Sequence, residues 1–180
     1  MVPSAEGTCL FETPFGVCGL AWSARGVTSF QLPEADAAET AARLARRGVP
    51  AAPPSAIEAA RDALRRYFAG EAVDLDGIVL DLGGVPPSER GVYDETRRIG
   101  RGETTTYGVL AARVGAPGAA RAIGRAMGRN PIPVIVPCHR VLASGDRMGG
   151  FSAHGGTVTK ERLLRLEGAA AVRQLAIAFA

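Results

Sequence analysis

The Gly-Gly-Val-Pro-Pro sequence at residues 83–87 divides this chain into two parts with different patterns. Paired glycines and paired prolines interrupt helices and strands alike. Residues 1–85 carry 7 basic and 11 acidic side chains, whereas residues 86–180 carry 14 basic and 7 acidic ones. Because the charge balance and the hydrophobic period change at the same place, we expect one domain over 1–85 and a second over 86–180.

The first domain has the pattern of short strands followed by helices. Short apolar runs between turn residues predict three strands in the order of a meander. The strands are Thr8–Thr13, Gly16–Trp22 and Val27–Phe30, with a further candidate at Ile78–Leu82. Apolar residues at helical spacing predict helices at Ala35–Arg47 and Ser55–Ala69. Ser55 is the expected N-cap of the second helix and Gly70 its stop. The predicted fold class is α/β or α+β.

The second domain is expected to be mainly helical. The predicted helices are Ser88–Ile99, Thr106–Val114, one opened by Pro117 and closed by Gly128, and Thr157–Leu166. The short connection Gly115-Ala116 between the second and third of them fits a helix-turn-helix, whose second helix normally enters a groove of DNA.

Small residues dominate this second helix. Ala120, Ala122 and Gly124 surround Arg121, and arginines recur every four residues. Small side chains form no hydrogen bonds with base edges, so the helix is poorly equipped to read sequence. They do allow close approach, and an arginine among them fits a narrow minor groove or the space left by an extruded base. The alternative is that the alanines are present for their high helix propensity and that the arginines form a solvated stripe without a DNA-binding role.

The basic second half favours a polyanionic partner, since neutralising phosphates releases counterions. A solvated basic surface is the alternative. There is no run of eighteen apolar residues, and the start of the chain lacks a signal segment, so we expect a soluble cytoplasmic protein. Three widely spaced cysteines indicate reduced thiols.

The tract from Asn130 to Arg140 places one thiol, Cys138, beside the imidazole of His139 and the guanidinium of Arg140. Basic neighbours commonly produce a thiolate near neutral pH, and the thiolate is the nucleophile. The sequence therefore predicts that Cys138 is the reactive residue.

These motifs resemble the O6-alkylguanine-DNA alkyltransferase family. The resemblance is carried by Tyr107, the helix around Arg121, Asn130-Pro131, the Pro-Cys-His-Arg-Val tract at 137–141 and residues 160–168. It implies an N-terminal ribonuclease-H-like domain and a C-terminal winged-helix-like domain. It also implies irreversible transfer of an alkyl group to Cys138 from O6 of guanine, or O4 of thymine, in double-stranded DNA, without a cofactor.

The resemblance implies a role for each neighbour of Cys138. Adjacent residues on a helix or turn do not face one another, so His139 is expected to act as a general base through one bridging water. Glu167 would hold the histidine tautomer, as the third group of a triad does. Asn130 would tie turn backbone groups together, and Tyr107 would hydrogen-bond the leaving guanine.

The remaining implied roles concern DNA and the base pocket. The expected DNA contacts are Ala120, Arg121, Ala122, Gly124, Arg125 and Arg140. The expected pocket residues are Met127, Pro133, Val141, Phe151 and Ser152. The loop after Ser152 is two residues longer than the family pattern, through Ala153-His154, and His154 has no assigned role.

No metal is expected. The histidines are His139 and His154, both in the second half, so Cys9 and Cys18 fall two ligands short of a tetrahedral zinc site. We expect these cysteines to be buried in strands. We also expect a monomer.

Three other functions are alternatives to alkyl transfer. A cysteine hydrolase needs an oxyanion hole, and no glycine-rich donor motif lies at Cys138. A non-catalytic protein that binds alkylated DNA lacks the cysteine. A winged-helix regulator needs a helix that reads base edges.

Overall fold

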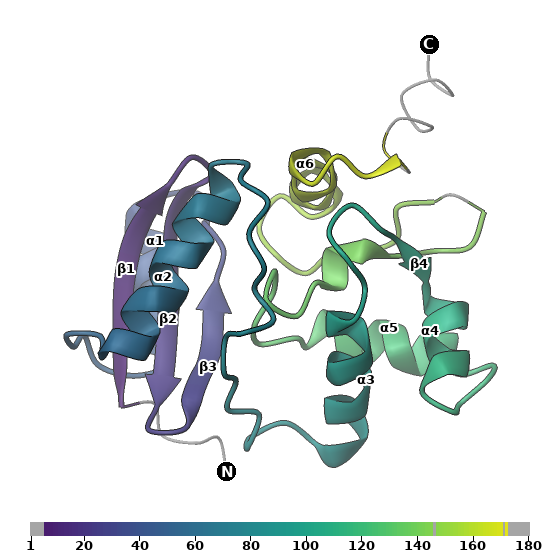
Figure 1. Cartoon of the computed structure of the whole chain (residues 1–180), viewed down its shortest axis with the longest axis horizontal. Helices are drawn as coiled ribbons and strands as arrows, with labels where there is room; N and C mark the ends of the chain where they lie inside the picture. The colour runs from purple at the N-terminus through teal and green to yellow at the C-terminus, as the bar shows by residue number, and fades with distance from the viewer. Residues whose placement is uncertain (1–5, 146, 171, 173–180) are drawn as a thin grey trace. The chain divides into compact units, whose positions relative to one another are not determined.

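The computed structural model describes residues 6–145, 147–170 and 172. These residues form two compact units (Figure 1). One contains the chain up to Val85 together with Pro131–Ile135, and the other contains Pro86–Asn130 and the chain from Val136 onward. The outer ends of the two expected domains, residues 1–5 and 173–180, lie outside the described residues.

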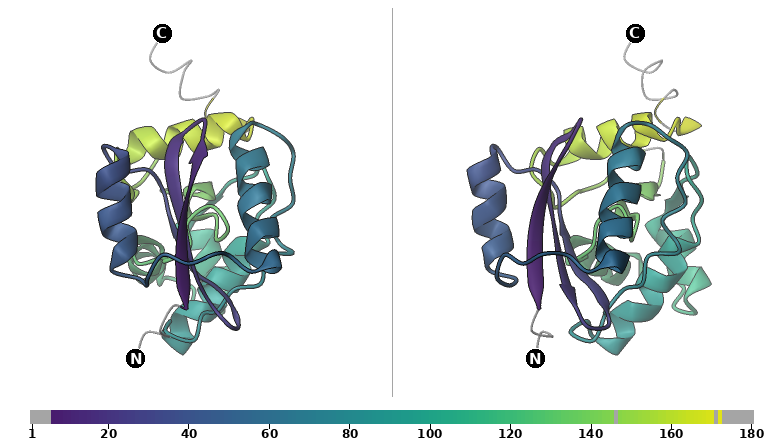
Figure 2. Two further views of the ribbon diagram at one scale, coloured as in Figure 1. Left: turned by 90° about the vertical axis from the view of Figure 1, so that its left-hand side faces the viewer. Right: turned by 60° about the vertical axis from the view of Figure 1, so that its left-hand side comes forward.

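The first unit is built on an antiparallel sheet in the order β1-β2-β3, which confirms the predicted meander. The strands are β1 Gly7–Thr13, β2 Gly16–Ser23 and β3 Gly26–Gln31. The inner residues of β2 are fully buried because helices cover both faces of this sheet: α1 (Ala37–Ala45) and α2 (Ser55–Phe68) lie on opposite sides (Figures 1 and 2). The sheet is therefore the middle layer of this unit.

Both helices differ slightly from their predicted ends. The N-cap of α1 is Asp36, whose carboxylate accepts a 2.8 Å hydrogen bond from the Glu39 amide. Ser55 was predicted as the N-cap of α2, but Pro54 occupies that position and Ser55 is the first helical residue. The fixed φ of proline holds the extended conformation that an N-cap requires. Gly70 follows the helix with φ of 92° and ends it as predicted.

The predicted strand at Ile78–Leu82 is wrong. Its pairing is limited to a single bridge, between Val27 and Leu80, made by bonds from the Val27 amide to the Val79 carbonyl and from the Asp81 amide to the Val27 carbonyl. The Asp81 side chain accepts instead from Ser23 Oγ, at 2.6 Å, which ties the segment to the end of the hairpin.

Two hydrogen bonds explain why Pro131–Ile135 packs with the first unit. The Pro131 carbonyl accepts from the Phe30 amide at 3.0 Å and from Ser29 Oγ at 3.0 Å. Ile132, Val134 and Ile135 are buried. Of the two cysteines expected to be buried in strands, Cys18 is buried, whereas Cys9 is only partly so.

The second unit is mainly helical. Its helices are α3 Pro87–Arg97, α4 Tyr107–Arg113, α5 Ala120–Gly128 and α6 Thr157–Leu166, and a short parallel pair joins β4 (Thr105–Thr106) to β5 (Val141–Leu142). Pro117 was predicted to open α5, but the helix begins three residues later because Gly118 adopts φ of 86°. Among the described residues, no helix is long and apolar enough to span a bilayer.

Candidate active site

Cys138 begins a single 3₁₀ turn, Cys138–Arg140, that follows Pro137. The Arg140 amide closes this turn on the Pro137 carbonyl at 2.9 Å. Cys138 is 5% exposed and His139 is fully buried. Three residues per turn direct these consecutive side chains to different sides, so His139 does not face the thiol directly.

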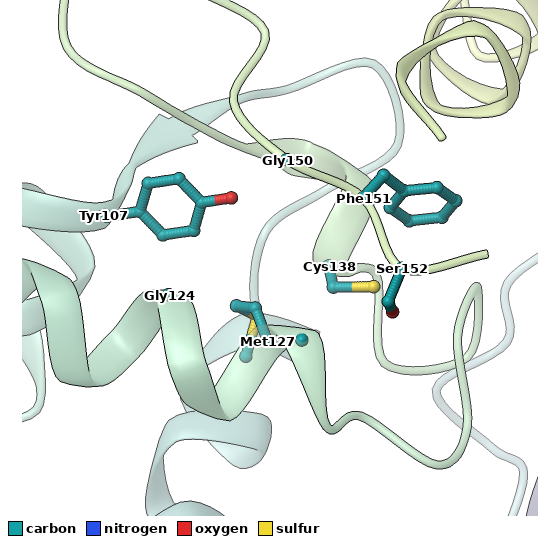
Figure 3. A pocket seen from close by; sticks show the side chains of 8 residues that line it. Tyr107, Gly124, Met127, Cys138, Gly150, Phe151 and Ser152 are labelled. Atoms are coloured by element: carbon teal, nitrogen blue, oxygen red, sulfur yellow. The ribbon is translucent and has the colours of Figure 1, made fainter. Parts of the chain in front are cut away.

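The thiol contributes to the wall of a cavity of about 410 Å³ (Figure 3). The lining residues are Tyr107, Gly124, Met127, Gly128, Cys138, Gly150, Phe151 and Ser152. The Tyr107 hydroxyl points toward the side on which Cys138, Phe151 and Ser152 lie (Figure 3). The volume is in the usual range for small-ligand sites, and the lining is largely apolar with a few polar groups.

A buried ion-pair network lies behind the thiol. His139 Nε2 is 2.9 Å from Glu167 Oε1. Arg140 donates to the same carboxylate through Nε, at 2.9 Å to Oε2, and through Nη2, at 2.8 Å to Oε1. This two-pronged contact fixes the plane of the carboxylate and therefore the orientation of the imidazole.

The electrostatics of this network favour a neutral histidine. Burial lowers the pKa of His139, although Glu167 opposes the change. Burial alone would raise the pKa of Glu167, but hydrogen bonds from His139 and Arg140 outweigh it and hold that pKa well below its usual range. An ionised carboxylate accepts only, so Nε2 carries the proton and Nδ1 is the basic nitrogen. Within the described part of the chain, no group forms a hydrogen bond with Nδ1.

The expectation of a thiolate at neutral pH is wrong for this closed site. Burial raises the pKa of Cys138, and the Asn130 side chain and the charge of Lys160 offset only part of that rise. Desolvation penalises the anion more than the nearby basic groups stabilise it. The resting nucleophile is therefore a thiol that needs a base.

Asn130 joins the end of α5 to the cysteine tract. Its backbone amide nitrogen donates to the Met127 carbonyl at 3.3 Å, and its side-chain Nδ2 donates to the Val136 carbonyl at 2.8 Å. This is the backbone-tying geometry that the sequence predicts for an asparagine in a turn.

Comparison with known proteins identifies the family. The sequence model for "6-O-methylguanine DNA methyltransferase, DNA binding domain" matches residues 87–169. The methylated-DNA–protein-cysteine methyltransferase of Methanothermobacter thermautotrophicus is 39% identical over 150 residues, which cover 83% of this chain and 78% of that protein. This chain belongs to the methylated-DNA–protein-cysteine methyltransferase family.

Solved structures of this family share the mixed α/β fold. Mycobacterium tuberculosis OGT in complex with DNA matches with a TM-score of 0.74 and 35% identity, covering 92% of this chain and 97% of that one. The O6-methylguanine-DNA methyltransferase of Pyrococcus kodakaraensis matches with a TM-score of 0.68 and 29% identity, covering 91% and 99%.

Lys160 lies near Tyr107 and Cys138 in this member of the methyltransferase family, and the sequence did not predict it as a site residue. Its ammonium is fully buried and donates to the carbonyls of Val141, at 2.7 Å, and Gly150, at 3.4 Å. It also lies 5.8 Å from the centre of the Tyr107 ring. Burial lowers its pKa to about 8, and Cys138 opposes that change. The available signal was that Lys160 is the only lysine in the chain.

Several of the predicted site residues lie on the exposed side of α5 or in the wall of the cavity. Arg121, Ala122 and Arg125 are exposed on α5, and Ala120 and Gly124 are partly exposed. Met127, Phe151 and Ser152 line the cavity.

Three predicted residues lie elsewhere. Arg140, predicted to contact DNA, has an 11% exposed side chain that is held by Glu167. Val141 is fully buried, and Pro133 packs with the first unit; neither is among the described residues that line the cavity.

Proposed function

We propose that this chain repairs DNA directly by accepting an alkyl group from O6 of guanine, or from O4 of thymine, onto Cys138. The observation that carries the proposal is a thiol in the wall of a cavity, backed by a neutral imidazole whose proton is fixed by Glu167. The family relatives are named for transfer to a protein cysteine, and one of the solved relatives is bound to DNA.

His139 supplies the base in this proposal. Nδ1 is the nitrogen without the proton, because Nε2–H points to Glu167. Since the imidazole and thiol do not face each other, one water molecule carries the thiol proton to Nδ1. Glu167 and Arg140 then stabilise the imidazolium without accepting its proton.

The transfer is a displacement at carbon. Sγ of Cys138 forms a bond to the alkyl carbon as the bond from that carbon to O6 breaks, and the electron pair leaves with the purine. The leaving purine takes one proton from the Tyr107 hydroxyl, and the proton that His139 received from the thiol is released to solvent and replaces it on Tyr107, so that the protons balance. Water has no easy route to displace a thioether, so each molecule reacts once.

The α4–α5 helix-turn-helix supplies DNA binding. Arg121 lies exposed among small residues, which fits insertion into the space of an extruded base. Arg125 lies one helical turn further along and is placed to meet a phosphate. Arg140 is not part of this DNA-binding surface because its guanidinium donates hydrogen bonds to the Glu167 carboxylate.

The proposal includes the finer features that the family resemblance implies. The unit around the β1-β2-β3 sheet is of the ribonuclease-H-like type, and the unit that carries Cys138 is winged-helix-like. One monomer acts on one lesion in double-stranded DNA, and the chain resides in the cytoplasm.

The test is intact-protein mass after incubation with duplex DNA containing O6-methylguanine. We expect a gain of one methyl group per chain, located on the peptide that contains Cys138, and an equal amount of repaired guanine. Cys138→Ser is the control and should remain unmodified. Repeated turnover, or methylation of another residue, would contradict the proposal.

A further inference from the structure

One face of α3 holds the last turn of α5. Glu89, Tyr93 and Thr96 recur at helical spacing on α3 and are buried. Tyr93 Oη donates a 2.9 Å hydrogen bond to the Ala126 carbonyl. Thr96 Oγ1 donates to the Val92 carbonyl of its own helix at 2.6 Å and lies 3.9 Å from Met127 Sδ. Ala126 in the last turn of α5 is therefore held by a polar group of a different helix.

Arg129 directs the Tyr93 proton toward α5. This arginine is the C-cap of α5 and forms an ion pair with Glu89 Oε1. The other carboxylate oxygen, Oε2, lies 3.3 Å from Tyr93 Oη. A phenol has one proton, and here it has two acceptors, the carboxylate and the Ala126 carbonyl. The guanidinium weakens the carboxylate as a competitor, which leaves the proton for the nearer carbonyl.

Tyr93 keeps that proton throughout the accessible pH range. Burial raises the pKa of Tyr93, and the negative charge of Glu89 raises it further. The hydroxyl is thus a permanent donor inside the unit.

The turn that Tyr93 holds leads directly to the reactive tract. Met127 is in that turn and lines the cavity. The Asn130 amide bonds to the Met127 carbonyl, and the Asn130 side chain bonds to Val136, two residues before Cys138. The Ala126 carbonyl accepts from the Arg129 amide at 3.0 Å as well as from Tyr93 Oη, so the Tyr93 hydroxyl adds a restraint from outside the helix to its closing turn.

We infer that Tyr93 is a positioning residue for alkyl transfer, which fixes the last turn of α5 and thereby places Met127 and Asn130 against Cys138. This rests on the proposed function. The hydroxyl rather than the ring carries the role, since a phenylalanine fills the same space in the core.

The first test is the rate constant for methyl transfer within the protein–DNA complex, measured in single-turnover experiments with Tyr93→Phe. We expect a fall of about 3- to 10-fold, as for the loss of one buried hydrogen bond, with the Kd for DNA changed less than about 2-fold. Tyr67→Phe is the matched control: it removes a buried hydroxyl in the first unit and should leave the rate constant unchanged. An unaltered rate constant in Tyr93→Phe overturns the inference.

A double-mutant cycle tests whether Tyr93 acts through Asn130. If it does, Tyr93→Phe changes the rate much less in an Asn130→Ala background than in the parent. If Tyr93→Phe slows transfer by the same factor in the Asn130→Ala background as in the parent, Tyr93 does not act through Asn130.

Hydrogen exchange separates this inference from the proposed function, because it needs no transfer activity. Amides of Ala126–Asn130 should exchange faster in Tyr93→Phe than in the parent, and those of α6 should not. Unchanged exchange at Ala126–Asn130 refutes the positioning role, whereas a parent chain that takes up no methyl group refutes only the proposed function.

Discussion

His139 Nε2 and Glu167 Oε1 are 2.9 Å apart, with both side chains fully buried, although the two residues are 28 positions apart in the chain. This contact determines which imidazole nitrogen carries the proton. It makes Glu167 the residue on which the basicity of Nδ1 depends, and the first prediction follows from it.

Glu167→Gln is expected to slow methyl transfer by about 100-fold, at the lower end of what general-base catalysis contributes. An amide that donates to Nε2 would move the proton to Nδ1 and remove the base. Single-turnover transfer gives the rate. Glu161→Gln is the matched control on α6, since Glu161 pairs with Arg165 at the surface. Equal rates in Glu167→Gln and the parent would exclude the proposed proton path.

The transfer rate is expected to remain constant as the pH falls from 8 to about 6.5, and to decline only at lower pH. Burial lowers the pKa of His139, so the base stays unprotonated below the usual histidine range. Rates measured across this range, with DNA at saturating concentration, give the profile. A midpoint above pH 7 would contradict the environment described for His139.

The free energy of unfolding should decrease as the pH falls from 7 to 4. The folded-state pKa values of His139 and Glu167 are both depressed. Each group therefore contributes stability that is present above its unfolded pKa, about 6.5 for histidine and about 4.3 for glutamate, and is lost below it. Urea unfolding at several pH values measures the slope. His139→Gln should flatten its upper part between about pH 7 and 5.

Lys160 should give a corresponding dependence of stability on pH in the alkaline range. Its pKa in the folded protein is about 8, so between pH 8 and its unfolded value near 10.4 the unfolded chain binds more protons. Its contribution to stability therefore rises with pH over that window, by as much as about 3 kcal/mol. Comparing urea unfolding of the parent and Lys160→Met isolates it. A difference between the two that does not change from pH 8 to 10 would contradict the buried position of the ammonium.

The two exposed arginines of α5 should have separable effects on DNA. Arg125→Ala is expected to weaken binding to all duplexes and to reduce the slope of log K against log salt by about 1. Arg121→Ala should slow transfer from duplex DNA more than from single-stranded DNA, because extrusion from a stack is the step it assists. Equal slowing on both substrates would argue against insertion of Arg121.

Local patterns predicted the parts of the fold that local chemistry determines. The meander followed from alternating runs and turns, and α6 has the predicted ends, Thr157 and Leu166. The strand expected at 78–82 was wrong because pairing depends on which backbone groups of a sheet edge are free, and among the described residues this segment pairs only at Val27. Periodicity contains no information on that point.

The site shows the same division. The Pro-Cys-His-Arg tract identified the nucleophile, but its protonation depends on burial, which the sequence does not state. Arg140 appeared available for DNA because its partner, Glu167, lies 27 residues away. Lys160 was missed because a single lysine on a helix is normally solvated.

The bond from Phe30 to Pro131 has a practical consequence for anyone who dissects this protein. Expression of residues 86–180 alone would give a fragment with Ile132, Val134 and Ile135 stripped of the strand beside them, a few positions from the reactive sulfur. The truncated fragment is therefore a poor substitute for the whole chain in assays. A failure of the fragment to take up a methyl group would not show that Cys138 is unreactive in the intact protein.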